Sequence, residues 1–373
     1  MADSTGILAH EVERAVFTAS QWRLVWLAFI RHKLAVACAV FLILGYLSAA
    51  FADFVAPYPT DFRNDDAPFV PPMRVHVRDT DGRFHRPFVY ALELERDPVT
   101  LRPHFREVTD SRYPIRFLVP GSEYEMWGVF RSRLHLFGVD DGAYYYLLGT
   151  DKQGRDILSR TVFAGRISLT IGLVGVVVSF ILAIALGSIS GYFGGLADMA
   201  IQRVIEVLTS LPQLPLWMAL AVAIPIGWPI TRVFFAITVI LSLISWPGLA
   251  REVRGKVLTL RETDYVTAAR IDNAGTARLL FQYLVPGVLS HLIASLTLAI
   301  PNMILGETAL SFLGVGLRAP AISWGVLLQQ AQNIQTVALS PWLMTPVFAV
   351  ILVILAFNFV GDGLRDAADP YKS

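Results

Sequence analysis

Six long apolar stretches constrain this chain more than any other feature of its sequence. A bilayer core about 30 Å thick needs roughly 20 apolar residues in a helix that crosses it. The stretches are Leu34–Val55, Ile167–Ile189, Ala200–Ile224, Val233–Leu249, Val288–Leu313 and Trp342–Val360. Only 16% of the residues are charged, whereas soluble globular domains carry roughly a quarter. The sequence therefore predicts an all-α polytopic membrane protein with six transmembrane helices.

The start of the chain and its composition exclude several classes of protein. Glu11, Glu13 and Arg14 precede the first apolar stretch, which is longer than the core of a secretory signal peptide, so we expect an uncleaved anchor. A formal net charge of +1 gives no basic field for nucleic acid. The single cysteine, Cys38, excludes an internal disulfide and a cysteine-based metal site. We expect neither nucleic acid nor metal to bind this chain.

Basic residues in short loops predict the orientation in the membrane, because such loops stay in the cytoplasm. Lys and Arg gather before the first stretch and between the fourth and fifth stretches. The arginine-rich segment between the first two stretches is too long to count in this rule. We divide the chain into a cytoplasmic segment 1–33, a first helix 34–56, an extracytoplasmic insertion 57–147, a core 148–361 with a cytoplasmic loop 251–286, and a cytoplasmic tail 362–373.

The insertion 57–147 has the pattern of a small β-containing subdomain. Val75 and Val77 precede Asp81-Gly82, and apolar residues alternate with polar ones from Phe88 onward. An Asp-Gly pair between two alternating runs is a strong hairpin signal. A disordered loop is the alternative, which aromatic residues such as Trp127 and Tyr144 argue against.

The membrane stretches contain residues that shape a helix bundle. Gly172, Gly175 and Gly187 predict close helix approach in the second helix. Prolines predict three irregularities: an interruption of the third helix at Pro212 and Pro215, an end of the fourth helix at Pro247, and a kink at Pro301. Freed backbone carbonyls must face protein or a water-filled path. A transport pathway and simple packing both remain open.

Several chemistries have no support in the sequence. There is no phosphate-binding GxxxxGK[ST] loop and no HExxH zinc motif. Gly191–Gly195 is glycine-rich but follows a membrane helix, so we expect a tight turn at the membrane surface. Glu307 is the clearest ionisable group inside an apolar stretch, and an intramembrane carboxylate is a candidate for the pathway or for a structural hydrogen bond.

Three stretches carry motifs that together resemble one family. The first holds Gly149, Thr150, Asp151, Gly154, Arg155, Asp156 and Arg160. The second holds Asp264, Tyr265, Thr267, Ala268, Ala269 and Arg270, with Pro286 further on. The third runs from Leu310 through Trp324 to a Gly-Asp-Gly-Leu-Arg-Asp segment at 361–366. The chain resembles the "C"-type permease subunits of dipeptide/oligopeptide/nickel ABC importers over about 21–58 and 147–372, which implies the type I importer permease fold. The insertion falls outside this resemblance.

The resemblance implies that 263–286 is the coupling loop that docks on an ATPase subunit. Thr267 stands where the family often has Glu, and Asn273 where it has Gly. Asn tolerates a positive φ, so a turn between two short helices can survive, with Gly275 as a second candidate for that task. Apolar residues at approximate helical spacing also predict an amphipathic segment here, namely Val266, Ala269, Ala277, Leu280 and Leu284. Without the resemblance, a helix lying on the membrane explains this segment equally well.

The resemblance also implies the partners and the activity. They are a second homologous permease, two ATP-binding subunits that hold ATP and Mg, an extracytoplasmic solute-binding protein, and the lipid of a bacterial inner membrane. The chain itself is then no enzyme and binds no cofactor. Peptides, above all oligopeptides, are the expected solute, and oligosaccharides, opines and nickel chelates are carried by other relatives. An ion-coupled secondary carrier and a membrane scaffold are the alternatives from other classes.

Overall fold

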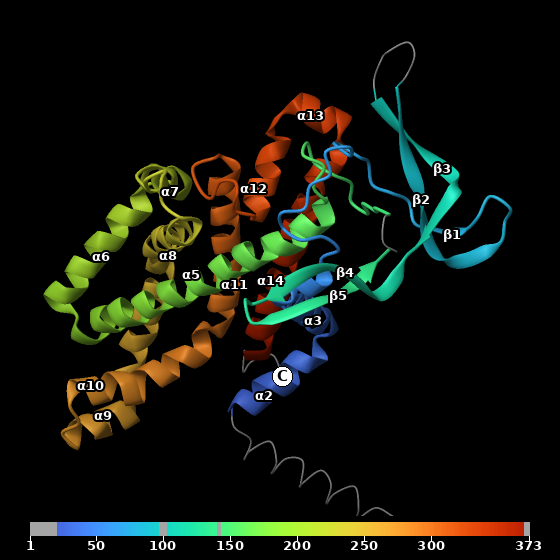
Figure 1. The fold of residues 1–373 in the computed structure, drawn as a ribbon. Coiled ribbons are helices and arrows are strands. Elements are labelled where there is room, and N and C mark those ends of the chain that lie inside the picture. The colour runs from blue at the N-terminus through green and yellow to red at the C-terminus, as the bar shows by residue number, and fades with distance from the viewer. Residues whose placement is uncertain (1–20, 97–102, 140–142, 369–373) are drawn as a thin grey trace, which may run out of the picture.

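The computed structural model describes residues 21–96, 103–139 and 143–368, and the expectations for 1–20 and 369–373 lie outside these residues. A helix bundle forms most of the chain, and a β-rich insertion projects from one side of it (Figure 1). The N-terminal helices are α2 (Gln21–Arg31), α3 (Lys33–Ala50) and α4 (Ala52–Val55). The central helices are α5 (Ile157–Phe193), α6 (Gly195–Ser210), α7 (Gln213–Val222), α8 (Ile230–Leu260), α9 (Asp264–Ile271) and α10 (Thr276–Arg278). A π-helical turn, Leu279–Leu284, then leads into α11 (Val285–Phe312), which is followed by α12 (Trp324–Gln329), α13 (Ile334–Leu339) and α14 (Thr345–Ala368).

Five helical segments of the described chain are long and apolar enough to cross a membrane singly. They are Lys33–Ala50, Ile157–Phe193, Ile230–Leu260, Leu292–Phe312 and Pro341–Ala368. The expected third span is instead the pair α6 and α7, whose axes meet at 90°. Leu211 is extended there (φ −95°, ψ 140°), the conformation that a following proline imposes. Each of the other five expected stretches falls within or overlaps one of these helices.

The expected end of the fourth helix at Pro247 is wrong. Helix α8 continues through Pro247 to Leu260. A proline inside a helix removes one backbone hydrogen bond and costs about 3 kcal/mol. Trp246, Leu249 and Ala250 are buried in a cluster with α5 and α6, and this apolar packing holds the helix together across the proline. Pro301 lies inside α11, as expected.

Helix α5 packs against α8 at the glycine positions that the sequence singled out. A Cβ atom on Gly187 would lie 2.7 Å from the Ala250 carbonyl oxygen, which is closer than any side chain tolerates. A Cβ atom on Gly172 would lie 2.7 Å from Ile304 of α11, and one on Gly175 would lie 3.3 Å from Met303 of the same helix. The Ser242 hydroxyl donates to the Gly175 carbonyl across the interface (3.0 Å). The prediction of close helix approach is confirmed.

The described part of the insertion contains two antiparallel sheets. The first has the strand order β1 (His76–Arg78), β2 (Phe84–Arg96), β3 (Pro103–Pro114), and the second pairs β4 (Arg116–Met126) with β5 (Phe130–Gly138). The turn between β1 and β2 is the predicted Asp-Gly hairpin, with Gly82 at φ +80°. The Asp79 carboxylate accepts hydrogen bonds from the backbone N–H groups of Asp81 and Arg83 in this turn. In the described part of the insertion, the alternative of a disordered loop is wrong.

Aromatic side chains attach the insertion to the bundle. Tyr145 and Tyr146 are buried with Val70, Met73 and Val89 in one apolar cluster. Tyr58, just after α4, donates a hydrogen bond to the Tyr145 carbonyl (3.2 Å). The Tyr58 N–H also donates to the hydroxyl of Ser159 in the first turn of α5 (3.1 Å), which joins the base of the insertion to the bundle.

Candidate functional site

Two regions bring the predicted motif residues together, one at each end of α5. We call residues 149–160 the clasp and residues 261–286 the tip. The tip connects α8 to α11 and contains α9 and α10, which lie at the lower left in Figure 1. The clasp precedes and begins α5 and contacts the base of the insertion. Each is described below from its backbone outward.

The turn of the tip follows the expectation for Asn273. This residue has φ +55°, and its N–H donates to the Arg270 carbonyl (3.0 Å). The next N–H, of Ala274, donates to the Ala269 carbonyl (3.0 Å) and closes α9. Gly275 has φ −60°, so it does not share the positive-φ task; it precedes α10 as its N-terminal cap. Pro286 lies in the first turn of α11, where a proline is tolerated.

The interior of the tip is apolar. Val266 and Ala269 of α9 are buried against Val253 and Val257 of α8, together with Leu284. Ala277, which we expected on the same apolar face, is exposed. Ala269 thus faces into the tip and serves to position α9.

The outer surface of the tip combines polar and large apolar groups. Ile271 is 83% exposed and Phe281 is 72% exposed. The side chains of Asp264, Tyr265, Thr267, Ala268 and Arg270 are also exposed. Sequence reasoning missed Ile271 and Phe281, although an apolar residue outside an amphipathic stripe is a usable signal for a docking surface.

Two arginines tie the tip to the end of α5. The Arg261 guanidinium donates to the Gly191 carbonyl (3.1 Å). The Arg270 guanidinium carbon lies 5.5 Å from the centre of the Tyr192 ring, a cation–π distance. Both contacts join the tip to α5 in addition to its covalent link to α8.

The clasp is a tight loop that locks α5 to the base of the insertion. The Thr150 N–H donates to the Val70 carbonyl (2.9 Å), and the Val70 N–H donates to the Thr150 hydroxyl (2.8 Å). The Trp342 indole donates to the Thr150 carbonyl (3.0 Å), which adds the segment before α14. Gly149 and Gly154 have φ +79° and +65°, so the loop requires residues without a side chain at both positions.

Charged residues stabilise the clasp through an ion pair and a helix cap. The Asp151 carboxylate is paired with the Arg155 guanidinium (2.6 Å), and Arg160 approaches the same carboxylate at 4.0 Å. Asp156 caps α5 by accepting from the N–H and the hydroxyl of Ser159 (both 2.7 Å). Burial raises the pKa of Asp156 to about 6, because a charged carboxylate is poorly solvated there. The Nε atom of Arg160 has no hydrogen-bond partner among the described residues.

Glu307 is fully buried where α5 and α11 meet. Its carboxylate accepts hydrogen bonds from the hydroxyls of Ser168 (3.0 Å) and Ser311 (2.8 Å). The Ser168 oxygen also accepts from the N–H of Trp324 at the start of α12 (3.2 Å). These contacts place Glu307 in a closed network among three helices and favour the structural role over the pathway role.

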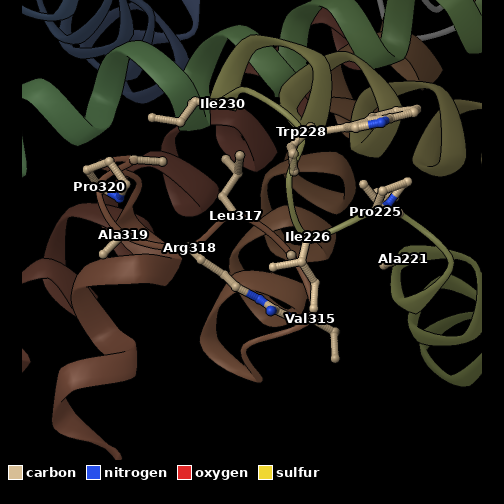
Figure 2. A pocket seen from close by; sticks show the side chains of 14 residues that line it. Ala221, Pro225, Ile226, Trp228, Ile230, Val315, Leu317, Arg318, Ala319 and Pro320 are labelled. Carbon is tan, nitrogen blue, oxygen red and sulfur yellow. The ribbon is translucent and has the colours of Figure 1, made fainter.

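Two cavities adjoin at the end of the bundle that carries the clasp. One of about 170 Å³ lies between the α7–α8 connection and residues 315–321. Figure 2 shows its apolar side chains, among them Ile226, Trp228 and Leu317, together with Arg318. The other, of about 440 Å³, is lined by arginines of the clasp and α5 and shares Ile230 and Pro320 with the first. Within residues 21–96, 103–139 and 143–368 no cluster of His, Cys, Asp and Glu has metal-binding geometry.

The chain is similar in sequence to known transport proteins. Residues 183–372 match the family described as "Binding-protein-dependent transport system inner membrane component", and residues 20–72 match the "N-terminal TM domain of oligopeptide transport permease C". The chain is 40% identical over 227 residues to the oligopeptide transport system permease protein OppC of Haemophilus influenzae, covering 61% of this chain and 70% of that protein. It is 38% identical over 224 residues to the dipeptide transport system permease protein DppC of Bacillus subtilis, covering 60% and 68%.

A solved structure of the MetNI methionine ABC transporter is 21% identical to the chain and covers 56% of this chain and 96% of that one. Its TM-score of 0.41 is too low to support an argument about the fold. The two family matches and the two relatives confirm the resemblance that the motifs indicated. This chain belongs to the family of binding-protein-dependent transport system inner membrane components, and its N-terminal part to that of oligopeptide transport permease C.

Proposed function

We propose that this chain is a membrane-spanning permease subunit of an ATP-driven, binding-protein-dependent importer of peptides. The relatives named as oligopeptide and dipeptide permeases support the peptide as solute. The observation that carries the proposal is the tip, a helix–turn–helix between two membrane spans whose core is packed and whose outer surface exposes Ile271 and Phe281. A solvent-exposed apolar surface of this kind needs a partner.

The proposed topology has six spans with both termini in the cytoplasm. In it α6 and α7 together form the third span, bent at Pro212. Gly363 near the end of α14 packs against Ala35 near the start of α3, so the two ends of the described chain lie on the same side of the bundle. The basic residues of the 251–286 loop and of the segment before α3 support a cytoplasmic location for this side.

In this mechanism the tip docks into a groove on an ATP-binding subunit. Ile271 and Phe281 enter the groove, while Asp264, Thr267 and Arg270 make polar contacts at its rim. ATP and Mg stay on that partner, and this chain contributes no catalytic residue. A second, homologous permease completes the pathway, and a second ATP-binding subunit docks on it. Binding and hydrolysis of ATP shift the bundle between inward-facing and outward-facing states because the partner has different affinity for the two.

The proposal is tested by purifying the tagged chain in mild detergent and identifying what elutes with it. Recovery of a second permease and one or two ATPases, followed by peptide uptake in proteoliposomes that contain the complex and its binding protein, is the expected result. Uptake that survives ATP depletion and stops with an uncoupler would instead establish an ion-coupled carrier. Uptake of an oligosaccharide, an opine or a nickel chelate in place of peptides would correct the solute and keep the importer.

The insertion is proposed to contact the solute-binding protein. Its first sheet, β1–β3, projects away from the bundle (Figure 1). Phe84, the first residue of the central strand β2, is 74% exposed. Phe84→Ser changes this exposed surface and leaves Val89 in its apolar cluster with Val70 and Tyr145. Weaker stimulation of ATPase activity by the binding protein is expected. Stimulation equal to that of the unmodified complex would refute this role.

A further inference from the structure

The turn of the β4–β5 hairpin carries an exposed apolar cluster. Trp127 is 57% exposed, Val129 is 72% exposed and Phe130 is 63% exposed. Trp127 and Gly128 have φ +54° and +70° and lie at the centre of a turn that the Val129 N–H closes by donating to the Met126 carbonyl (3.1 Å). We call residues 127–130 the hairpin turn. Three large apolar side chains at the end of a polar insertion are unusual, because such turns are normally built from Asn, Asp and Gly.

The hairpin turn is attached to the end of a membrane-spanning helix. The Trp127 indole donates a hydrogen bond to the Ala50 carbonyl, the last residue of α3 (2.9 Å). The Trp127 ring lies 5.1 Å from the ring of Phe51. A tryptophan enters the positive-φ region at a steric cost, so these two contacts account for its presence at this position. Figure 1 shows the β4–β5 pair lying beside α3, apart from the projecting sheet.

The exposed apolar side chains of α3 indicate that lipid surrounds the hairpin turn. Only 17% of the span Lys33–Ala50 is buried inside the chain, and Ile43, Leu44 and Leu47 are about half exposed. Such residues on a spanning helix face lipid. Because Trp127 contacts the last turn of this helix, it lies at the level where the hydrocarbon core ends. Tryptophan is enriched at this boundary, where its apolar ring and its N–H meet both environments.

Basic residues follow the apolar cluster. Arg131 and Arg133 are exposed on β5 directly after Phe130, and Arg131 is paired with Glu125 of β4. Arginines next to buried aromatics at a membrane surface reach the phosphate groups of lipids. In the hairpin turn, apolar side chains come first and charged side chains follow. This order is that of a segment that enters a bilayer from the water side.

We propose that the hairpin turn inserts Trp127, Val129 and Phe130 into the lipid interface beside the outer end of α3. The hairpin turn therefore contacts the phospholipid surface. Its exposed apolar side chains continue the lipid-facing side of α3, which argues for lipid over a protein partner. The inference goes beyond peptide import and uses the proposed topology only to name the leaflet as the outer one. The anchored hairpin fixes the height of the insertion above the membrane, because β5 and β4 also pack on α4.

The test removes the single native cysteine, Cys38, so that one introduced cysteine can be labelled. In a Cys38→Ala background of the full-length chain, purified with its co-eluting partners and placed in proteoliposomes, Phe130→Cys is labelled with an environment-sensitive fluorophore. Phe84→Cys is the matched control, since it replaces another largely exposed phenylalanine (74%, against 63% for Phe130) on the projecting sheet. We expect a blue-shifted emission at position 130 that is quenched by phospholipids spin-labelled near the headgroup. The label at position 84 should show a water-like spectrum without quenching.

Two results would overturn the proposal. A label at position 130 with the same spectrum as the control would show that the hairpin turn faces water. A blue shift without quenching by spin-labelled lipid would show that protein covers it, for example the second permease. Val129→Cys provides an independent site should the Phe130 variant fold poorly, and the same two outcomes apply to it. Because the readout does not involve transport, it is independent of whether the solute is a peptide.

Discussion

Substitution of Gly154 by alanine tests whether the clasp holds the insertion on the bundle. Gly154 has φ +65°, where alanine costs about 1–2 kcal/mol relative to its preferred conformations. A Cβ atom at this position would also lie 1.8 Å from the Asn64 carbonyl oxygen. The segment around Asn64 must therefore move. Such a move breaks backbone hydrogen bonds of the clasp, including that from Phe69 to the Asp151 carbonyl, at roughly 1 kcal/mol each.

The expected loss of unfolding free energy for Gly154→Ala is thus about 2–4 kcal/mol, from the backbone cost and one or two hydrogen bonds. Gly194→Ala is the matched control, because Gly194 has φ +63° and no atom within 4 Å of the added Cβ. It should lose only the backbone cost of about 1–2 kcal/mol.

Thermal unfolding of the detergent-solubilised chain is followed with a thiol-reactive dye, which reacts when the half-buried Cys38 becomes exposed. A midpoint for Gly154→Ala equal to that of Gly194→Ala would show that the Asn64 contact contributes nothing, and would refute the reasoning.

Three further predictions address the buried carboxylate, the tip and the insertion. Glu307→Gln should leave ATP-driven uptake nearly unchanged, whereas Glu307→Ala should lower the thermal midpoint, because two serine hydroxyls lose their acceptor at about 1 kcal/mol each; loss of uptake in the Gln variant with intact folding would contradict a structural role. Ile271→Glu should reduce transport-coupled ATPase activity at an unchanged thermal midpoint, whereas Ala269→Glu should lower the midpoint, because only Ala269 is buried; equal midpoints would contradict the assigned orientation of α9. A hydrogen bond from the Arg83 N–H, with further donors, lowers the pKa of Asp79 from 3.8 to about 2, so its stabilisation of the β1–β2 turn is present above about pH 4 and lost as the pH falls through 2. Limited proteolysis of the insertion over this range should show that loss in the native chain and not in Asp79→Asn.

Features that depend on local chemistry could be predicted from the sequence. The Asp81-Gly82 hairpin and the Asn273 turn follow from which residues tolerate a positive φ. The glycines of the second apolar stretch identified the side of α5 on which other helices pack. The membrane spans themselves follow from hydropathy and length.

Features that depend on distant contacts could not be predicted. Pro247 has the same local chemistry as Pro212, yet α8 continues through one and the chain bends by 90° at the other. The difference lies in the packing around Trp246, which no local pattern records. The clasp likewise joins Gly149 to Val70 and Trp342, residues far apart in the chain. The positions of α8 and α11 determine which side of α9 faces outward. The exposure of Ile271 could therefore not be predicted from the sequence.

The contacts of the tip determine which helices a motion of the tip can carry with it. Gly187 and Gly191 bring the α5 backbone directly against carbonyls of α8 and against the side chains of Val253 and Val257. The buried core of the tip, through Val253 and Leu284, joins α8 to α11. Tightly packed interfaces of this kind shift as units and do not deform gradually. We infer that α5, α8, α11 and the tip move together, and that α6 moves with them, because Asp198 of α6 pairs with Arg254 of α8 (2.6 Å).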